Sequence, residues 1–201
     1  LGIEGDQPVD IKAGGSLTII LGDGTRNELC STNINHAALH CPTGASLIID
    51  DAMLNRTADG RHIVPENGKV PYDCTLSNGK AVSRNDPLST LESNLPGELY
   101  AWAPSGALAA GIGSNYLGTP RDIAHRDQDE PAGNMTFDGG LIVAKSGSNT
   151  NPNSDGAGIG SGRCGPGTGL NEWITINGGR VSAQGAGHGA GIGSGALAPS
   201  G

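Results

Sequence analysis

An aspartate and a histidine occupy the same place before two copies of a Gly-rich segment. GAGIGSG at 156–162 recurs at 189–195, and Asp155 and His188 come directly before the two copies. If the copies stack, the carboxylate lies beside the imidazole and fixes its tautomer, as a general acid or base requires. We therefore predict Asp155 and His188 as the catalytic pair if the protein is an enzyme. A solvated ion pair at a loop corner is the alternative interpretation.

A tryptophan, a lysine and a glutamine align in the strands that precede these segments. Trp102, Lys145 and Gln184 occupy equivalent positions in PGELYAWAP at 96–104, MTFDGGLIVAKSG at 135–147 and ITINGGRVSAQGA at 174–186. An exposed aromatic ring beside a cation on a flat sheet can hold a sugar by stacking and hydrogen bonds. We predict these three residues, with Arg163 at the next junction, as substrate-binding residues. The alternative is that a neighbouring loop covers Trp102.

Other ionisable residues lie in segments with strong turn signals. The densest group is Arg121, Asp122, His125, Arg126, Asp127, Asp129 and Glu130. Loops on a rigid scaffold often carry function, although a charge-rich loop is also simply solvated. His36 and His40 are four residues apart in NINHAALHC, where polar turns argue against a metal-binding helix, so we predict them as loop residues. No metal site and no cofactor is predicted, since zinc spacing and the calcium repeat Gly-Gly-x-Gly-x-Asp are both missing from the sequence.

The repeats determine how these residues must be positioned. A looser third copy, AAGIGSN, occupies 109–115, and each copy follows short strands with period-two alternation. Strands of three to five residues cannot bury a face alone, so the units must stack into a parallel β-solenoid. Leu99, Ile142 and Val181 should then form one inner column. GSLTII at 15–20 and ASLIID at 45–50 are weaker copies, with Leu17 matching Leu47.

The sequence predicts one all-β domain over residues 1–201 with two long loop insertions. The first, at approximately 52–96, has poor periodicity and many turn signals, and the second, at 115–133, replaces a shorter junction in the later copies.

The Gly-rich and ITINGGRVSA patterns resemble the repeats of secreted right-handed parallel β-helix proteins of bacteria and fungi. The resemblance covers residues 96–195 and, more weakly, 14–50. Those proteins are described as carbohydrate-binding or pectate-lyase-like, so the resemblance implies a right-handed β-solenoid that binds an extracellular polysaccharide. A small polysaccharide-cleaving enzyme, either a glycoside hydrolase or a lyase, is one alternative. A structural solenoid that self-associates is the other.

Composition and charge exclude several classes of partner. Glycine and proline number 35 and 12, and aromatic residues make up only 3%, so a thick globular core is not expected. Twelve basic and twenty acidic residues give a net charge of −8, with no basic stripe for nucleic acid or anionic lipid. No apolar stretch approaches the roughly 18 residues of a membrane span.

The cysteines and the first residue suggest export. The chain begins with Leu1 rather than Met, which indicates that a leader has been removed and predicts a secreted protein. Four cysteines without C-x-x-C spacing favour two disulfides over a metal site. We predict that Cys30 pairs with Cys41 and that Cys74 pairs with Cys164.

Overall fold

The protein is all-β with parallel sheets in its computed structural model. The structure describes residues 2–22, 24–51, 57–59, 63, 66–67, 69–76, 79–87, 96–117, 130–147 and 155–196. These residues contain strands, turns and bends but no helix, which confirms the predicted all-β class. Across the same ranges, no helix is long and apolar enough to cross a membrane.

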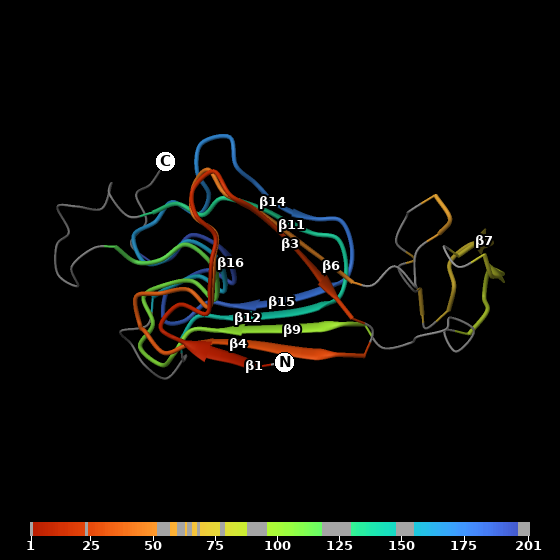
Figure 1. Ribbon diagram of the computed structural model, residues 1–201, viewed down its shortest axis with the longest axis horizontal. Coiled ribbons are helices and arrows are strands. Elements are labelled where there is room, and N and C mark those ends of the chain that lie inside the picture. The colour runs from red at the N-terminus through yellow and green to blue at the C-terminus, as the bar shows by residue number, and fades with distance from the viewer. Residues whose placement is uncertain are drawn as a thin grey trace.

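Three parallel sheets, here named A, B and C, form the main body (Figure 1). Sheet A runs along the lower side of Figure 1 and consists of β1 (Gly2–Gly5), β4 (Arg26–Ser31), β9 (Glu98–Trp102), β12 (Leu141–Lys145) and β15 (Arg180–Gln184). Sheet B consists of β2 (Val9–Asp10), β5 (Leu39–His40), β10 (Ile112–Gly113), β13 (Ile159–Gly160) and β16 (Ile192–Gly193). Sheet C, on the slanting upper side, consists of β3 (Ser16–Leu21), β6 (Ser46–Asp51), β11 (Asn134–Phe137) and β14 (Ile174–Ile176).

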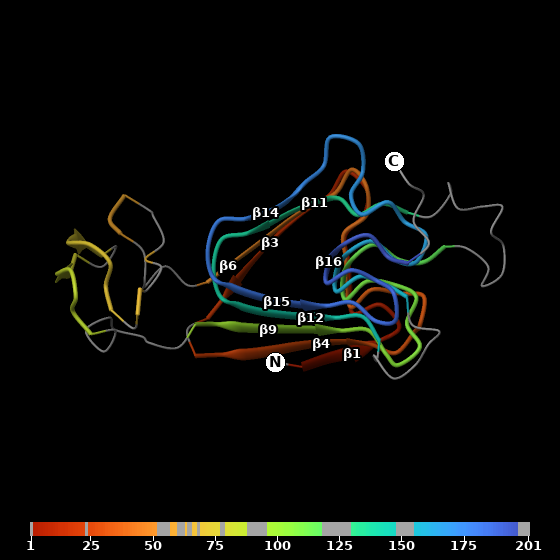
Figure 2. The same cartoon turned by 180° about the vertical axis from the view of Figure 1, so that it is seen from behind.

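The chain visits the three sheets in a fixed order, A then B then C. We call each passage a circuit: β1 to β3 form circuit 1, β4 to β6 circuit 2, β9 to β11 circuit 3, β12 to β14 circuit 4, and β15 with β16 circuit 5. Each strand pairs in parallel with its counterpart in the neighbouring circuit. Seen from behind, Figure 2 shows the same three sides. Equivalent residues of successive circuits therefore lie one strand spacing apart, about 4.8 Å.

The inner columns have the predicted register. Ile142 pairs with Leu99 on one side and with Val181 on the other, and Leu99 and Ile142 are buried. In sheet C, Leu17 pairs with Leu47, as the weaker copies predicted. Phe137, the only phenylalanine in the chain, is also fully buried. Mostly small and aliphatic side chains are sufficient because the parallel sheets enclose a narrow interior.

A column of glycines in sheet B shows why the Gly-rich segments recur. Gly113, Gly160 and Gly193 pair across β10, β13 and β16, and their φ angles are 132°, 131° and 129°. A Cβ atom added to Gly113 would lie 1.8 Å from the carbonyl oxygen of Gly160, and one added to Gly160 would lie 1.9 Å from that of Gly193. Glycine is required at positions 113 and 160 because neither the backbone conformation nor the space accepts a side chain, and at position 193 because of the backbone conformation alone.

The interval between β6 and β9 contains a small separate element. Strands β7 (Cys74–Thr75) and β8 (Ala81–Val82) form an antiparallel pair, which lies away from the three sheets in Figure 1. Its apolar side chains form their own cluster, made up of Ile63, Val70, Leu76 and Val82. The described part of the predicted 52–96 insertion is therefore organised around a hairpin and a local core.

Candidate functional site

Two places in the fold gather polar or aromatic side chains at the surface: the outer face of sheet A and the corner that joins sheet A to sheet B. On the outer face, Trp102 pairs with Lys145, and Lys145 pairs with Gln184. Trp102 is 39% exposed, and the Lys145 ammonium lies 5.6 Å from the centroid of its ring. The predicted substrate-binding row is therefore assembled by strand register across β9, β12 and β15.

Tyr100 contacts the Trp102 ring, and Arg26 contacts Tyr100 in turn. Tyr100 contacts Trp102 edge-to-face, with the ring centroids 6.1 Å apart and an interplanar angle of 68°. Arg26 on β4 places its guanidinium 4.1 Å from the centroid of the Tyr100 ring and pairs with Glu28 at 2.7 Å. Each ring–cation contact of this kind contributes about 0.5–1 kcal/mol at an exposed site. A continuous series of ring and cation contacts thus extends over β4, β9 and β12.

Sequence reasoning missed Arg26 because the strand that carries it lacks a clear apolar alternation. Asn27 occupies the inner position that Leu99 occupies in the next circuit, and its side-chain amide donates to the Glu98 carbonyl at 3.1 Å. The one sequence signal for β4 was Leu29, an apolar residue that is buried and pairs with Ala101.

The second place is the corner between sheets A and B in circuits 4 and 5. His188 Nδ1 lies 3.4 Å from Asp155 Oδ1, and Arg163 Nε lies 3.4 Å from Asp155 Oδ2. The Asp155 carboxylate is buried, whereas the His188 side chain is 83% exposed. Arg163 therefore joins Asp155 instead of the row that contains Trp102.

Backbone hydrogen bonds fix the position of Asp155. Its amide donates to the Ala107 carbonyl at 3.2 Å, and its own carbonyl accepts a hydrogen bond from the Ala196 amide at 2.8 Å. Arg163 is tied to the same corner because its amide donates to the Leu108 carbonyl at 2.6 Å. The corner thus combines a buried carboxylate, a guanidinium 3.4 Å from it and a solvent-accessible imidazole, with the backbones of Asp155 and Arg163 held by hydrogen bonds. Chemically, this group can exchange a proton with a bound hydroxyl group.

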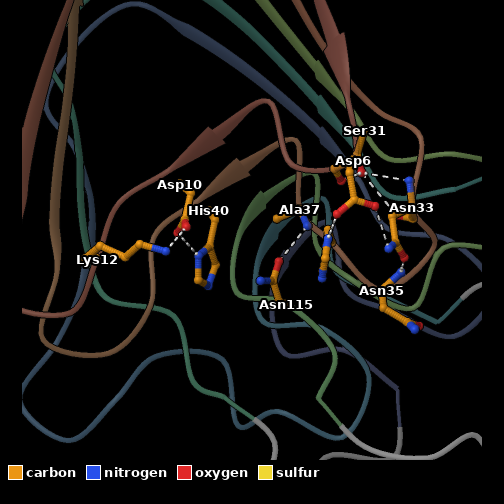
Figure 3. A network of polar contacts seen from close by, with 10 residues as sticks. Asp6, Asp10, Lys12, Ser31, Asn33, Asn35, Ala37, His40 and Asn115 are labelled. Carbon is orange, nitrogen blue, oxygen red and sulfur yellow. Dashed lines mark hydrogen bonds and ion pairs between the residues drawn. The ribbon is translucent and has the colours of Figure 1, made fainter.

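A buried histidine contacts two carboxylates in a third polar cluster, and the prediction of His40 as a loop residue was wrong. His40 lies in β5 and is buried. Its Nδ1 atom lies 2.8 Å from Asp10 Oδ1, and its Nε2 atom lies 2.7 Å from Glu130 Oε2. Lys12 Nζ pairs with the same Asp10 carboxylate, as Figure 3 shows. Because both ring nitrogens face carboxylates, both N–H groups donate and the imidazolium form is stabilised.

The pKa values of this cluster follow from its contacts. Burial alone would lower the pKa of His40, but hydrogen bonds with Glu130 and Asp10, and the charges of both carboxylates, raise it above its usual value. Hydrogen bonds from His40 and Lys12 lower the pKa of Asp10 despite partial burial. The contacts of this cluster therefore favour the charged forms of both His40 and Asp10.

A second histidine pairs with the preceding circuit at the corner that leads to β5. His36 Nδ1 lies 2.9 Å from Asp6 Oδ2, and the Asn33 side-chain amide donates to Asp6 Oδ1 at 2.8 Å. Figure 3 shows Asn33 beside Asp6. The hydrogen bond from Asn33 lowers the pKa of Asp6, with a further contribution from His36. The signal for both clusters was the 30-residue offset of Leu17 and Leu47, which also separates Asp6 from His36 and Asp10 from His40.

The predicted disulfides are not present, and this corrects the cysteine prediction. All four cysteines lie in the described ranges, and none is joined to another. Cys30 is on the outer side of β4, opposite Trp102, whereas Cys41 is fully buried beyond β5. Cys74 lies in the β7–β8 hairpin, and Cys164 follows β13. Cys30 thus lies on the outer face of sheet A, whereas Cys41 lies in the buried interior.

Several predicted residues fall outside the described chain. Arg121, Asp122, His125, Arg126, Asp127 and Asp129 are among them, whereas Glu130 lies in the His40 cluster. Among the described residues, no group of three or more His, Cys, Asp or Glu side chains is arranged to hold a metal ion. In comparisons with protein-family models, curated proteins and solved structures, the chain has no significant match, so its function must be argued from the two surfaces described above.

Proposed function

We propose that this protein is a secreted right-handed parallel β-solenoid that binds an extracellular polysaccharide on the outer face of sheet A. The observation that carries the proposal is the exposed Trp102 ring with the Lys145 ammonium 5.6 Å from its centroid on a flat sheet. An aromatic ring offers a flat apolar surface to the C–H groups of a sugar, and an ammonium group donates hydrogen bonds to its hydroxyl groups. Gln184, next in register, adds a donor and an acceptor.

The order of the strands supports the solenoid part of the proposal. Five successive circuits pass through sheets A and B in the same sequence, and each pairs in parallel with the circuit before it. About 98% of the connections between parallel strands of one sheet are right-handed. The same handedness is therefore the expected one here.

Preorganisation supports binding at Trp102. Tyr100 fixes one edge of the tryptophan ring, and Arg26 in turn fixes Tyr100. A ring that is already held in place loses little conformational entropy when a ligand stacks on it. The face therefore presents a defined platform.

The charges of the outer face favour a neutral or weakly charged glycan. Arg26 pairs with Glu28 at 2.7 Å and lies opposite Glu98 in register, so positive charge does not dominate this part of the face. The net charge of −8 also disfavours long polyanions. A neutral polysaccharide is not repelled by the acidic protein and does not require a basic stripe for binding.

The two tryptophans of the chain allow a matched test. Binding to a glycan array would identify ligands, and calorimetry would then give Kd for Trp102→Ala and for Trp173→Ala. Trp173 is more exposed than Trp102 but lies before β14, away from sheet A. We expect Trp102→Ala to weaken binding at least tenfold, about 1.4 kcal/mol, while Trp173→Ala stays within twofold.

A fluorescence measurement makes the same test independent of array chemistry. In the Trp173→Phe variant, Trp102 is the only tryptophan, so glycan binding should change its emission. Absence of binding to any glycan, or unchanged affinity in Trp102→Ala, would overturn the proposal. Detection of the chain in the medium of intact cells would test secretion.

Cleavage of the bound polysaccharide is the second candidate, favoured by the corner with Asp155, Arg163 and His188. An exposed imidazole beside an anchored carboxylate can transfer a proton to or from a sugar hydroxyl. Arg163 would contribute positive charge at the same corner.

Product analysis separates this candidate from simple binding. New reducing ends indicate hydrolysis, and unsaturated uronides indicate elimination by a lyase. General acid–base groups typically contribute about 10²–10⁴ in rate, so His188→Ala should reduce turnover at least about a hundredfold. The fold should survive because the side chain is solvent-exposed. Binding without products would assign the protein as a binding module only.

A further inference from the structure

Trp102, Lys145 and Gln184 form a row across the strands of sheet A, here named the Trp102 row. The three residues are partners in register on β9, β12 and β15, so neighbouring members are one strand spacing apart, about 4.8 Å. The row therefore follows the direction in which the circuits stack, across the strands. A ligand that contacts all three side chains has to lie in this direction.

The spacing of the row is fixed by the backbone. The Ala103 amide donates to the Lys145 carbonyl at 3.0 Å, and the Ser146 amide donates to the Gln184 carbonyl at 3.0 Å. Lys145 itself lies between two buried residues, Ala144 and Ser146. The strands that carry the row are thus held together directly beside it, and the distance between its members does not depend on side-chain rotamers.

The other neighbours of Trp102 are less suited to contact a sugar. Along β9, the next residue on the outer face is Tyr100, whose ring already contacts Trp102 and the Arg26 guanidinium. On β4, the partner of Trp102 is Cys30, and a thiol is only a weak hydrogen-bond donor. In the opposite direction, Lys145 has three donors and Gln184 has donors and an acceptor. The strongest hydrogen-bonding groups beside Trp102 therefore extend over β12 and β15.

The regular spacing favours one class of sugar chain. In β-1,4-linked glucose, mannose or xylose, both linkage bonds of each ring are equatorial, so the rings follow one another in a nearly straight ribbon. The length of one ring in such a ribbon is close to the spacing between strands. In α-1,4-linked glucose, one linkage bond is axial, and the chain curves into a helix. A row of evenly spaced side chains fits the ribbon better than the curved chain.

We infer that the outer face of sheet A binds an extended, ribbon-like neutral polysaccharide that lies across the strands, with consecutive sugar units at Trp102, Lys145 and Gln184. The inference rests on the proposed function and adds the class of chain, its direction and its register. Trp102 stacks on the first unit. The Lys145 ammonium and the Gln184 carboxamide form hydrogen bonds with hydroxyl groups of the second and third units.

Calorimetric titrations with disaccharides and trisaccharides test the class of chain. The extended probes are β-1,4-linked glucose, mannose and xylose, and the curved probe is α-1,4-linked glucose, which differs from the first only in the configuration of the linkage. For at least one extended sugar, Kd should fall about three- to tenfold from disaccharide to trisaccharide, because the third unit gains hydrogen bonds at Gln184. For the curved probe, we expect a gain of less than about 1.5-fold, because its third unit is turned away from the row.

Two results would overturn the class of chain. One is a gain with length for α-1,4-linked glucose that equals the gain for the extended sugars. The other is the absence of binding by all three extended sugars. In that second case, binding of a different glycan that is lost in Trp102→Ala would leave the proposed function intact, whereas binding of no glycan would overturn the proposed function as well.

Substitution of Gln184 tests the direction of the chain. In Gln184→Ala, the gain from disaccharide to trisaccharide should fall below about 1.5-fold, because the third unit loses its partner. Ser182→Ala is the matched control, since Ser182 is also exposed on the outer face of β15 but pairs with Val143. This control should retain the full gain. A gain that survives in Gln184→Ala, or that falls equally in Ser182→Ala, would overturn the inference.

Substitution of Lys145 tests the order of the units. Lys145→Met should weaken binding of both lengths about two- to tenfold, because the second unit is present in the disaccharide and in the trisaccharide. Each variant is compared with itself at two lengths, so a partial loss of folded protein would change both titrations alike and could not produce the result expected for Gln184→Ala. An effect of Lys145→Met on the trisaccharide alone would contradict the order and overturn the register.

Discussion

His40 Nε2 lies 2.7 Å from Glu130 Oε2, a contact between residues that are 90 positions apart in the chain. On its other side, the same ring contacts Asp10 through Nδ1 at 2.8 Å. The imidazolium thus joins β2 of circuit 1 and β5 of circuit 2 to the segment that leads into β11. One buried imidazole thus contacts carboxylates from two other segments of the chain.

This cluster predicts a stability maximum at mildly acidic pH. The pKa of His40 is raised on folding, so its contribution is complete below about its unfolded value of 6.5 and is lost as pH rises through the folded value. The pKa of Asp10 is lowered, so its contribution is complete above 3.8 and is lost as pH falls through the folded value. Urea denaturation at a series of pH values should show both slopes.

Substitution of His40 should eliminate the loss of folding stability at rising pH. His40→Gln leaves two carboxylates without their shared cation, and breaking a buried ion pair in this way costs about 3–5 kcal/mol. His36→Gln is the matched control, because His36 also pairs with an aspartate but is more exposed and should cost less than about 1 kcal/mol. Equal losses in the two variants would contradict the special role of the buried cluster.

Gly160 should not tolerate a side chain. Gly160→Ala would place a Cβ atom 1.9 Å from the Gly193 carbonyl oxygen at a φ of 131°. The conformational strain alone costs about 1–3 kcal/mol, and the clash adds to it. Chemical denaturation of Gly160→Ala and of the control Gly2→Ala checks this, since no atom lies within 4 Å of a Cβ on Gly2. The control should change stability by less than about 0.5 kcal/mol.

Ile142 should not tolerate a charge. Ile142→Asp would bury an unpaired carboxylate between Leu99 and Val181, at a cost of several kcal/mol. This is comparable with the total stability of a domain, about 5–15 kcal/mol, so we expect an unfolded or aggregated chain. Ile142→Val should cost only about 0.5–1.5 kcal/mol and remain folded by circular dichroism. A cooperative, native-like transition in Ile142→Asp would argue against the inner column.

The thiols of Cys30 and Cys41 should differ in reactivity. Burial raises the pKa of Cys41 to about 12, with a further contribution from the charge of Glu172, so almost no thiolate forms near neutral pH. Cys30 is partly exposed, and partial burial together with the charges of Glu28 and Glu4 raises its pKa. A thiol reagent should label Cys30 in the native protein and Cys41 only after denaturation. Mass mapping of the labelled peptides identifies which cysteine has reacted, and Cys30→Ser is the control. Labelling of Cys41 before Cys30 in the native protein would contradict the prediction.

The sequence alone was sufficient for the strands whose period-two alternation is repeated. Leu99, Ile142 and Val181 could be aligned because the units around them share both length and pattern, and alternation sends them to one face. The Trp102, Lys145 and Gln184 row followed from the same alignment. Local periodicity and repetition are properties of the chain itself, so they can be read without knowing the path between the strands.

Only the tertiary structure determined the side-chain contacts between circuits whose connecting segments differ in length. The long interval between β6 and β9 interrupts the repeat, so the contact of Arg26 with the Tyr100 ring could not be derived from repeat spacing. Glu130 reaches His40 only because the chain returns to the stack before β11. The direction of Cys30 and Cys41 likewise depended on their positions in β4 and beyond β5. Contacts between side chains distant in sequence depend on the three-dimensional course of the chain, which short-range alternation does not specify.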